Sequence, residues 1–321
     1  VRAEGAAGDA NAEGCFMSLE AALAWAAAYG TSGASAKTEI HIRGEVIVNS
    51  TITLQADNLS LYGEGESKLI TGTSLSPMID LNGKSSITIH GIDFSCEHAN
   101  STAIEDTSAS LYDLKVDRCN FDGSVEWERA INLISNVVTQ CQVIECRINA
   151  SERGINIPDA NGCHIARCAI QSNAIDLSPL NYGVLIGSPT STPTYGASKI
   201  DQVYSQNYAI GFYIGSIGTT IMNSYGLACG IGISVGIGSR EIEVYGNFIN
   251  SDNIANSSGI IVVGDNGSTA ENVNRINICN NEIINSALNG IIISGLARDV
   301  DISGNILDLY AGDATDPTAI A

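Results

Sequence analysis

The chain has 321 residues, with 15 Lys and Arg against 35 Asp and Glu and a formal net charge of −20. This charge repels phosphate backbones and anionic headgroups, so the composition argues against nucleic-acid binding. Hydrophobic residues at 44% and charged residues at 16% exclude an intrinsically disordered chain, and 33 Gly with only 6% aromatics favour many tight turns around an aliphatic core.

The N-terminal segment, residues 1–38, is predicted to cap the fold. Residues 1–14 are acidic and small where a signal peptide needs a basic end and an apolar stretch, so any export signal is expected to be absent or already removed. Ser18 is the expected N-cap of a short helix whose apolar face carries Phe16, Leu19, Leu23 and Ala26. No apolar run reaches the roughly 18 to 20 residues of a membrane-spanning helix, which argues against membrane insertion.

Two motifs then repeat along residues 39–310. Gly followed by alternating apolar residues occurs at Gly154, Gly183, Gly211, Gly230, Gly259 and Gly290, at steps of 29, 28, 19, 29 and 31 residues. A second motif reads Ile242-x-Val244-x-x-Asn247-x-Ile249 and recurs with the same spacing from Ile276 and from Val300. We also assign weaker copies that begin at Leu114, Cys141, Cys163, Ile200 and Thr219. Short alternating strands separated by turns must stack on equivalent strands to bury their apolar side.

This pattern resembles the right-handed parallel β-helix of the pectate-lyase-like superfamily. The resemblance covers residues 40–309 and implies an all-β solenoid of about ten coils with an N-terminal capping helix, followed by a tail at 311–321. It also implies work on carbohydrates, although the fold alone does not fix function. The chain lacks the polygalacturonase Asn-Thr-Asp, Asp-Asp and Gly-His-Gly pattern and the alginate-epimerase Asp-Pro-His motif. No catalytic residue is therefore carried over from the superfamily.

The register predicts what points inward. Asn247, Asn281 and Asn305 fall in one interior turn column, as in the asparagine ladders of this superfamily. The same column further up holds Cys119, Cys146 and Cys168, while Cys141 and Cys163 share an inward strand column. We interpret these cysteines as small buried fillers and not as disulfides, because neighbouring side chains run parallel. No metal cofactor is expected; calcium stays conceivable through Asp113, Asp117 and Asp122, which form no clear site.

The candidate catalytic and binding residues lie in the part of the coil where charged side chains point outward. The predicted catalytic residues are Glu128, Glu152, His164, Arg153 and Arg167, and the predicted substrate-binding residues are Trp127, Arg129, Tyr182, Tyr204 and Tyr208. Carboxylates one coil apart suit a retaining glycosidase, which favours Glu128 and Glu152 as a pair, with Trp127 on a protruding turn. Alternatively, the arginines neutralise a uronate while His164, in a column with Gln142 and Asp201, removes its C5 proton. A solvated charge ladder without function is the third interpretation.

The middle residues of the glycine strands predict self-association. Leu185, Tyr213, Ile261 and Ile292 alternate away from the core and are expected to form an outward apolar ridge. Such a ridge is covered in a homo-oligomer, a trimer or a filament, unless a loop such as 188–198 covers it. The preferred function is binding and cleavage of a polysaccharide outside the cell or on a virion surface. The competing hypothesis is a non-catalytic spike, adhesin or assembly subunit.

Overall fold

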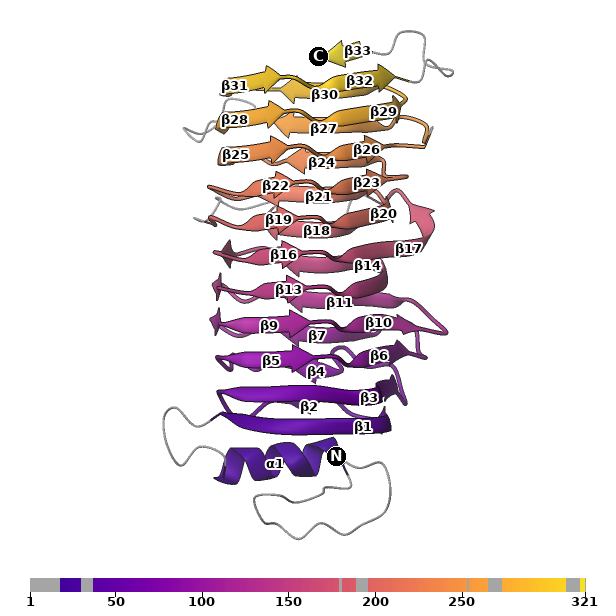
Figure 1. The fold of residues 1–321 in the computed structure, drawn as a ribbon, viewed down its shortest axis with the longest axis vertical. Helices are drawn as coiled ribbons and strands as arrows, with labels where there is room; N and C mark the ends of the chain where they lie inside the picture. The colour runs from indigo at the N-terminus through magenta and orange to yellow at the C-terminus, as the bar shows by residue number, and fades with distance from the viewer. Residues whose placement is uncertain are drawn as a thin grey trace.

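The computed structural model describes residues 18–29, 37–178, 181–188, 196–252, 254–264, 273–309 and 318–320, of which 174–176 and 318–320 are described for the backbone only. The chain winds as a three-faced coil in which equivalent strands of successive coils pair in parallel (Figure 1). No helix within the described ranges is long and apolar enough to cross a membrane. The architecture is a right-handed parallel β-helix, and the predicted fold class is confirmed.

Face 1 is one wall of the coil. It consists of β1 Thr38–Val48, β3 Leu59–Thr71, β5 Ile87–His90, β9 Leu114–Asp117, β13 Gln142–Ile144, β16 His164–Ala166, β19 Lys199–Asp201, β22 Thr220–Met222, β25 Arg240–Tyr245, β28 Val273–Cys279 and β31 Ala297–Ser303. Face 2 follows after a one-residue corner. It takes the C-terminal parts of β1 and β3, then β6 Asp93–Cys96, β10 Asn120–Gly123, the start of β14 Arg147–Ile157, β17 Ala169–Asp176, β20 Tyr204–Tyr208, β23 Tyr225–Leu227, β26 Phe248–Asn250, β29 Glu282–Ser286 and β32 Ile306–Leu309.

Face 3 closes each coil. It consists of β2 Ile52–Thr53, β4 Ile79–Asp80, β7 Thr102–Asp106, β11 Trp127–Leu133, the end of β14, β18 Tyr182–Gly187, β21 Ile210–Gly215, β24 Ile231–Val235, β27 Ser258–Val263, β30 Asn289–Ser294 and β33 Thr318–Ile320. A small separate sheet joins β8 Leu111–Tyr112, β12 Val138–Thr139 and β15 Ala160–Asn161. The aliphatic side chains of all three faces meet in one continuous core.

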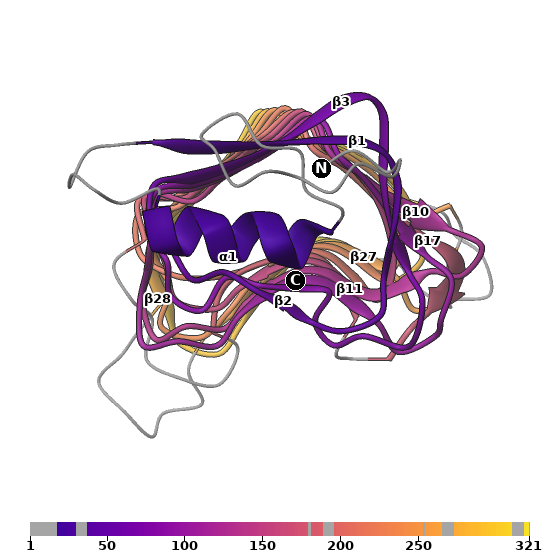
Figure 2. The ribbon, with the colours of Figure 1, turned by 90° about the horizontal axis from the view of Figure 1, so that it is seen from below.

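Helix α1, Leu19–Tyr29, lies across the N-terminal opening of the coil (Figure 2). Ser18 accepts a hydrogen bond at its Oγ from the backbone N of Ala21, at 3.1 Å, and this confirms the N-cap. Leu19, Leu23 and Ala26 are buried as predicted, whereas Phe16 lies outside the described residues. The helix thus covers apolar side chains and strand edges that would otherwise be exposed at this end.

A corner of one residue in the left-handed region joins face 1 to face 2 in each coil. The φ angles lie between 50° and 65° at Gly91, Arg118, Glu145, Arg167, Gln202, Asn223, Gly246, Asn280 and Gly304. The residue after each corner points inward, and this column contains the predicted cysteines and asparagines. Asn247 Nδ2 donates to Asn281 Oδ1 at 3.0 Å, and Asn281 Nδ2 donates to Asn305 Oδ1 at 2.9 Å. The asparagine ladder is confirmed.

The described cysteines are free, and those of the two predicted columns are buried as fillers, as predicted. Among the described cysteines, Cys279 is half-buried and the rest are buried. The thiol of Cys146 donates to the backbone oxygens of Ile144 and Val116, so each thiol satisfies carbonyls of its own and the preceding coil. These cysteines therefore fill the corner column without cross-linking the coils.

The register that the sequence predicts is wrong by two residues in two of the coils. Ile200 pairs with Ile165, so the weak motif begins at Ser198 and not at Ile200. Ile233 pairs with Phe212, so Gly232 and not Gly230 is equivalent to Gly211. Both coils carry polar or glycine substitutions at motif positions, and alternation of period two fits equally well after a shift of two residues.

The prediction of an outward apolar ridge is wrong for Leu185 and Tyr213. Leu185 and Tyr213 point away from the core but are only 2% and 7% exposed, and they form a separate buried cluster with Tyr182. Ser234 lies between Tyr213 and Ile261 in the column and interrupts it. Ile261 and Ile292 are half-buried. Self-association through these two isoleucines stays a prediction.

Candidate functional site

Three predicted residues meet where face 2 turns into face 3. Arg129 Nη2 lies 2.9 Å from Glu128 Oε1 and 3.0 Å from Glu152 Oε2. The two carboxylate oxygens are therefore no more than about 6 Å apart, near the separation of a retaining glycosidase pair. The guanidinium, however, occupies the space between them, where a glycosidic oxygen would have to enter. This geometry argues against Glu128 and Glu152 as an acid and nucleophile pair.

Arg153 stands beside this ion pair in the next coil, where it pairs in register with Arg129. The side chain is half-buried, and within the described part of the chain it has no ion-pair or hydrogen-bond partner; its Nε is buried and unbonded. Burial lowers the pKa of the Arg153 guanidinium, and the neighbouring charge of Arg129 lowers it further. Glu152 and Glu128 attract this charge without forming an ion pair with it. A half-buried charge without a contacting counterion is costly, and guanidinium groups bind carboxylate, sulfate and phosphate in a fork geometry.

Tyr182 continues this column, directly after Arg153. It is only 4% exposed, and its ring meets Tyr213 edge to face at 5.7 Å between centroids. Burial raises the pKa of the Tyr182 hydroxyl. The residue is thus brought to the predicted site, but its buried ring does not offer a face on which a sugar could stack. As a stacking residue it was predicted wrongly, because alternation places a side chain outside the barrel without showing what covers it.

A polar ladder on the middle column of face 3 was missed. Asn156 Nδ2 donates to Asn132 Oδ1 at 2.7 Å, and Asn132 Nδ2 donates to Glu105 Oε1 at 2.5 Å. These residues occupy the same strand position as Leu185 and Tyr213 in later coils. In the earlier coils, the middle position of the glycine strands is occupied by Glu105, Asn132 and Asn156. Each of these polar residues lies between inward apolar residues, so the sequence carried a signal for the ladder.

His164 and Arg167 are not part of this cluster. His164 begins strand β16 on face 1, and its register neighbours are Gln142 and Lys199. The expected neighbour Asp201 pairs with Ala166 instead, because the register of that coil was wrong by two residues. Burial lowers the pKa of His164, and its Nε2 is buried without a partner among the described residues. Beside Lys199, the imidazole has no carboxylate that would orient it as a base.

Arg167 belongs to a ladder of charges on the corner between faces 1 and 2. Glu145 accepts hydrogen bonds from Arg118 Nε at 2.9 Å and from Arg167 Nε at 3.0 Å, so the three residues form a charge ladder across three coils. The bond from Arg118, followed by that from Arg167, lowers the pKa of the Glu145 carboxyl. These side chains are largely exposed, so the ladder contributes little to stability.

The other predicted aromatic residues lie apart from the cluster. Trp127 and Tyr208 are fully buried, and the Tyr208 hydroxyl donates to the backbone oxygen of Ala150 at 2.7 Å. The expectation that Trp127 protrudes is wrong: its ring packs into the main core while its acidic neighbours Glu126 and Glu128 remain partly accessible. Tyr204 is half-buried on face 2 and donates to Gln206 Oε1 at 2.7 Å.

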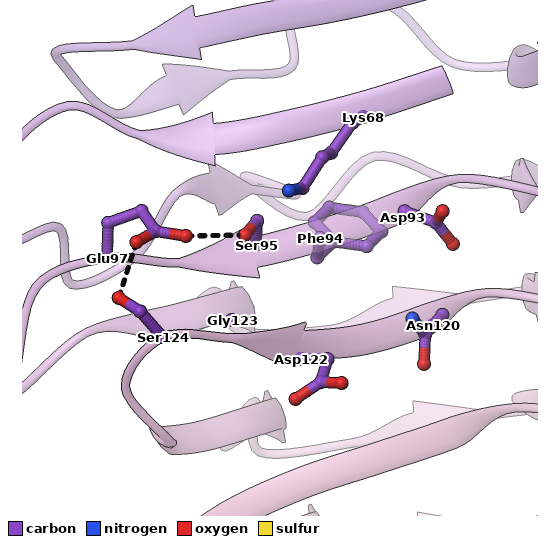
Figure 3. Close-up of a pocket in the computed structure, with 9 residues that line it drawn as sticks. All are labelled: Lys68, Asp93, Phe94, Ser95, Glu97, Asn120, Asp122, Gly123 and Ser124. Carbon is purple, nitrogen blue, oxygen red and sulfur yellow. Dashed lines mark hydrogen bonds between the residues drawn. The ribbon is translucent and has the colours of Figure 1, made fainter. Parts of the chain in front are cut away.

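A pocket of about 380 Å³ opens on face 2, across the end of β3 and strands β6 and β10 (Figure 3). Its lining is polar and alternates along the strands. The lining residues are Lys68, Asp93, Phe94, Ser95, Glu97, Asn120, Asp122, Gly123 and Ser124. The sequence carried a signal for this site, since the polar residues of Asp93-x-Ser95-x-Glu97 and Asn120-x-Asp122-x-Ser124 alternate with the apolar Phe94 and Phe121.

Glu97 is the most firmly held acid of this pocket. Ser95 Oγ donates to Glu97 Oε1 at 2.8 Å, and Ser124 Oγ donates to Glu97 Oε2 (Figure 3). The bond from Ser124, then that from Ser95, lowers the pKa of the Glu97 carboxyl, and the Lys68 ammonium acts in the same direction. No group of three or more His, Cys, Asp or Glu side chains in the described ranges lies close enough to hold a metal ion.

No protein-family model and no curated protein sequence matches this chain. Among solved structures, the A-module of mannuronan C-5 epimerase AlgE4 from Azotobacter vinelandii is 12% identical, covers 93% of this chain and 95% of its own, and gives a TM-score of 0.56. The catalytic domain of a GH87 alpha-1,3-glucanase in complex with tetrasaccharides is 15% identical, with 95% and 66% covered and a TM-score of 0.57. PfbA, a surface adhesin of Streptococcus pneumoniae, is 11% identical, with 91% and 86% covered and a TM-score of 0.53.

At these identities the likeness establishes the fold and no more. The similar structures are right-handed parallel β-helices, which agrees with the resemblance to the pectate-lyase-like superfamily. They include an epimerase, a glucanase and an adhesin. Because enzymes and a surface protein share the scaffold, the chemistry of this chain has to be argued from its own side chains.

Proposed function

We propose that the protein binds an acidic polysaccharide at the corner of Arg129, Arg153, Glu128 and Glu152, and cleaves it there by elimination. The observation that carries this proposal is Arg153, a half-buried guanidinium beside a second arginine and without a partner in the described ranges. A uronate carboxylate fits this position, because it would supply the missing counterion and bind the fork of the guanidinium.

Arg129 and Arg153 favour cleavage by elimination over cleavage by hydrolysis. Neutralising the carboxylate of a uronate stabilises the negative charge that develops when its C5 proton is removed. Glu152, with 44% of its side chain exposed, is the more accessible of the two carboxylates and is the proposed base. The C5–H electron pair then forms the C4–C5 double bond as the bond to the leaving oxygen breaks, and solvent water supplies the proton to that oxygen. A glycosidase would need the space that Arg129 occupies.

A second candidate function is glycan binding without cleavage, as in a spike or an adhesin. The observation that favours it is the double ion pair of Arg129, which engages both carboxylates and leaves neither free as a base. The adhesin among the similar structures supports this alternative, as the epimerase and the glucanase support the enzyme. Either function places the protein outside a cell or on a virion surface.

The test combines binding with turnover. Arg153→Gln is expected to weaken binding of uronate oligosaccharides at least tenfold, whereas the exposed Arg298→Gln removes the same charge far along the coil and should leave binding unchanged. Glu152→Gln is expected to abolish formation of unsaturated uronates, read by their absorbance, while binding remains. Retained binding with no turnover by the wild type across a broad polyuronate panel supports the non-catalytic function. If no acidic oligosaccharide binds, the proposal is wrong.

A further inference from the structure

The face 2 pocket has a charge opposite to that of the Arg153 corner. Asp93, Glu97 and Asp122 line it against the single cation Lys68. Two hydroxyls hold the Glu97 carboxylate in place, and Asn149 Nδ2 donates to Asp122 Oδ1 at 3.4 Å. The excess of carboxylates repels a uronate, so the ligand chemistry that suits the corner does not suit the pocket.

The free hydrogen-bonding groups of the pocket suit hydroxyl or amide groups. Asn120 adds an amide side chain to the lining, and its Oδ1 is buried and therefore closed to a ligand. Lys68, drawn above Ser95 in Figure 3, adds ammonium donors, and the carboxylates are acceptors. The one aromatic residue of the lining, Phe94, is 1% exposed and stacks on Phe121 inside the coil, so it offers no apolar contact surface. A neutral or N-acetylated sugar meets these requirements.

The pocket and the corner lie on two sides of the same turn. Ser124 lines the pocket, and Glu128, four residues later, pairs with Arg129 at the corner. Four residues span at most about 14 Å, so an oligosaccharide of a few residues reaches from one site to the other. Glu126, in the turn between the two sites, accepts a bond from the backbone N of Asn173 and so ties this turn to the end of β17.

We infer that the face 2 pocket is a subsite for a non-acidic sugar, and that the polymer recognised by this protein alternates acidic and non-acidic residues. The acidic half of this inference rests on the proposed function. The non-acidic half rests on the lining of the pocket alone. The protein thereby distinguishes a heteropolymer from a polyuronate, which can satisfy only the corner.

The test uses calorimetric titration of the full chain with three kinds of octasaccharide. These are alternating oligosaccharides from hyaluronan and chondroitin, an alginate oligosaccharide made only of uronates, and a chitin oligosaccharide without acid groups. At least one alternating oligosaccharide is expected to bind ten times more tightly than both homopolymers. Ser124→Trp, which fills the pocket from an exposed position, is expected to reduce that affinity to the alginate value and to leave alginate binding unchanged. Asp308→Trp places the same ring on the last coil of face 2 as a control.

The outcomes separate this inference from the proposed function. Alginate binding that depends on Arg153, with no preference for any alternating oligosaccharide, overturns the inference and keeps the function. Equal losses for alginate and for the alternating ligand in Ser124→Trp also overturn it, because the ring then disturbs the corner. Binding of the chitin oligosaccharide that Ser124→Trp abolishes, without any binding of acidic sugars, keeps the non-acidic subsite and rejects the proposed function.

Discussion

The interior corner column is filled by thiols in its N-terminal half and by amides in its C-terminal half. Cys119, Cys146 and Cys168 donate only to backbone oxygens. Asn281, by contrast, accepts from the backbone N and from Nδ2 of Asn247, and donates to Asn305 and to the backbone oxygen of Val244. The left-handed corner is the same in both halves and also precedes the buried Ile92 and Val203, so it requires a buried side chain and leaves donor and acceptor groups optional. The amide half is linked from coil to coil by bonds between side chains, whereas the thiol half is linked only by weak bonds from thiols to backbone oxygens of the preceding coil.

The largest difference between the halves is expected from Asn281→Ala. The substitution leaves buried partners on Asn247, Asn305 and Val244 unsatisfied, at roughly 1 to 3 kcal/mol each before relaxation. We expect the free energy of unfolding, measured by denaturant titration, to fall by about 3 to 5 kcal/mol. Asn136→Ala removes an exposed amide and should change it by less than about 0.5 kcal/mol. A loss as small as that of the control would show that the ladder does not stabilise the coil.

The second expected difference is a response to alkaline pH to which the buried thiols contribute and the amides do not. Burial raises the pKa of Cys229, a thiol outside the corner column, from 9.0 to about 12, and the pKa values of Cys146 and Cys168 in the column are raised as well. A thiol with a raised pKa in the folded state contributes stability that is complete below pH 9 and is lost as the pH rises towards the folded value. Cys229 alone should therefore cost roughly 2 to 3 kcal/mol between pH 8 and pH 11.

The measurement is the pH dependence of unfolding between pH 7 and pH 11 for the wild type and for Cys229→Ala. We expect the variant to be less stable at neutral pH and to show a shallower alkaline decline. The amides of the corner column do not titrate, so Asn281→Ala should show the same decline of stability with pH as the wild type. An identical slope in Cys229→Ala would mean that this thiol titrates in the folded state as it does in the unfolded chain.

The sequence predicted the corner column well because two constraints coincide there. The spacing of the second motif fixes which residue follows the left-handed corner, and alternation then places that residue in the buried interior. The register failed where Ser198 and Ser205 replace the usual apolar or Cys positions, since alternation alone cannot exclude a shift of two residues. His164 was paired with the wrong neighbour for this reason.

The outward surface was predictable only in part. Arg129, Glu128, Glu152 and Arg153 meet as expected because they precede the same strand in neighbouring coils. The burial of Tyr182 was not predicted, because it depends on which chain segments cover a face, and the repeat contains no information on this. Trp127 was assigned to a protruding turn, but its ring packs into the main core. The pocket of Glu97 was missed although its residues alternate with core positions. Its carboxylates are spaced along strands, whereas the predicted site was built on runs of adjacent charged residues.

The smallest expected effect comes from substitutions of a cysteine in the thiol half of the column. Cys146→Ser keeps a small donor in reach of Ile144 and Val116 but replaces a polarizable sulfur by a hydroxyl that is smaller and more strongly hydrated in the unfolded chain. We expect a loss of about 1 kcal/mol in denaturant titration. Cys146→Ala, which removes the donor and part of the packing, should cost about 1 to 2.5 kcal/mol. If the serine variant is instead less stable than the alanine variant, packing and not donation governs this half. The two halves would then share a position in the fold but not a mode of stabilisation, because the amide half depends on hydrogen bonds that alanine cannot replace.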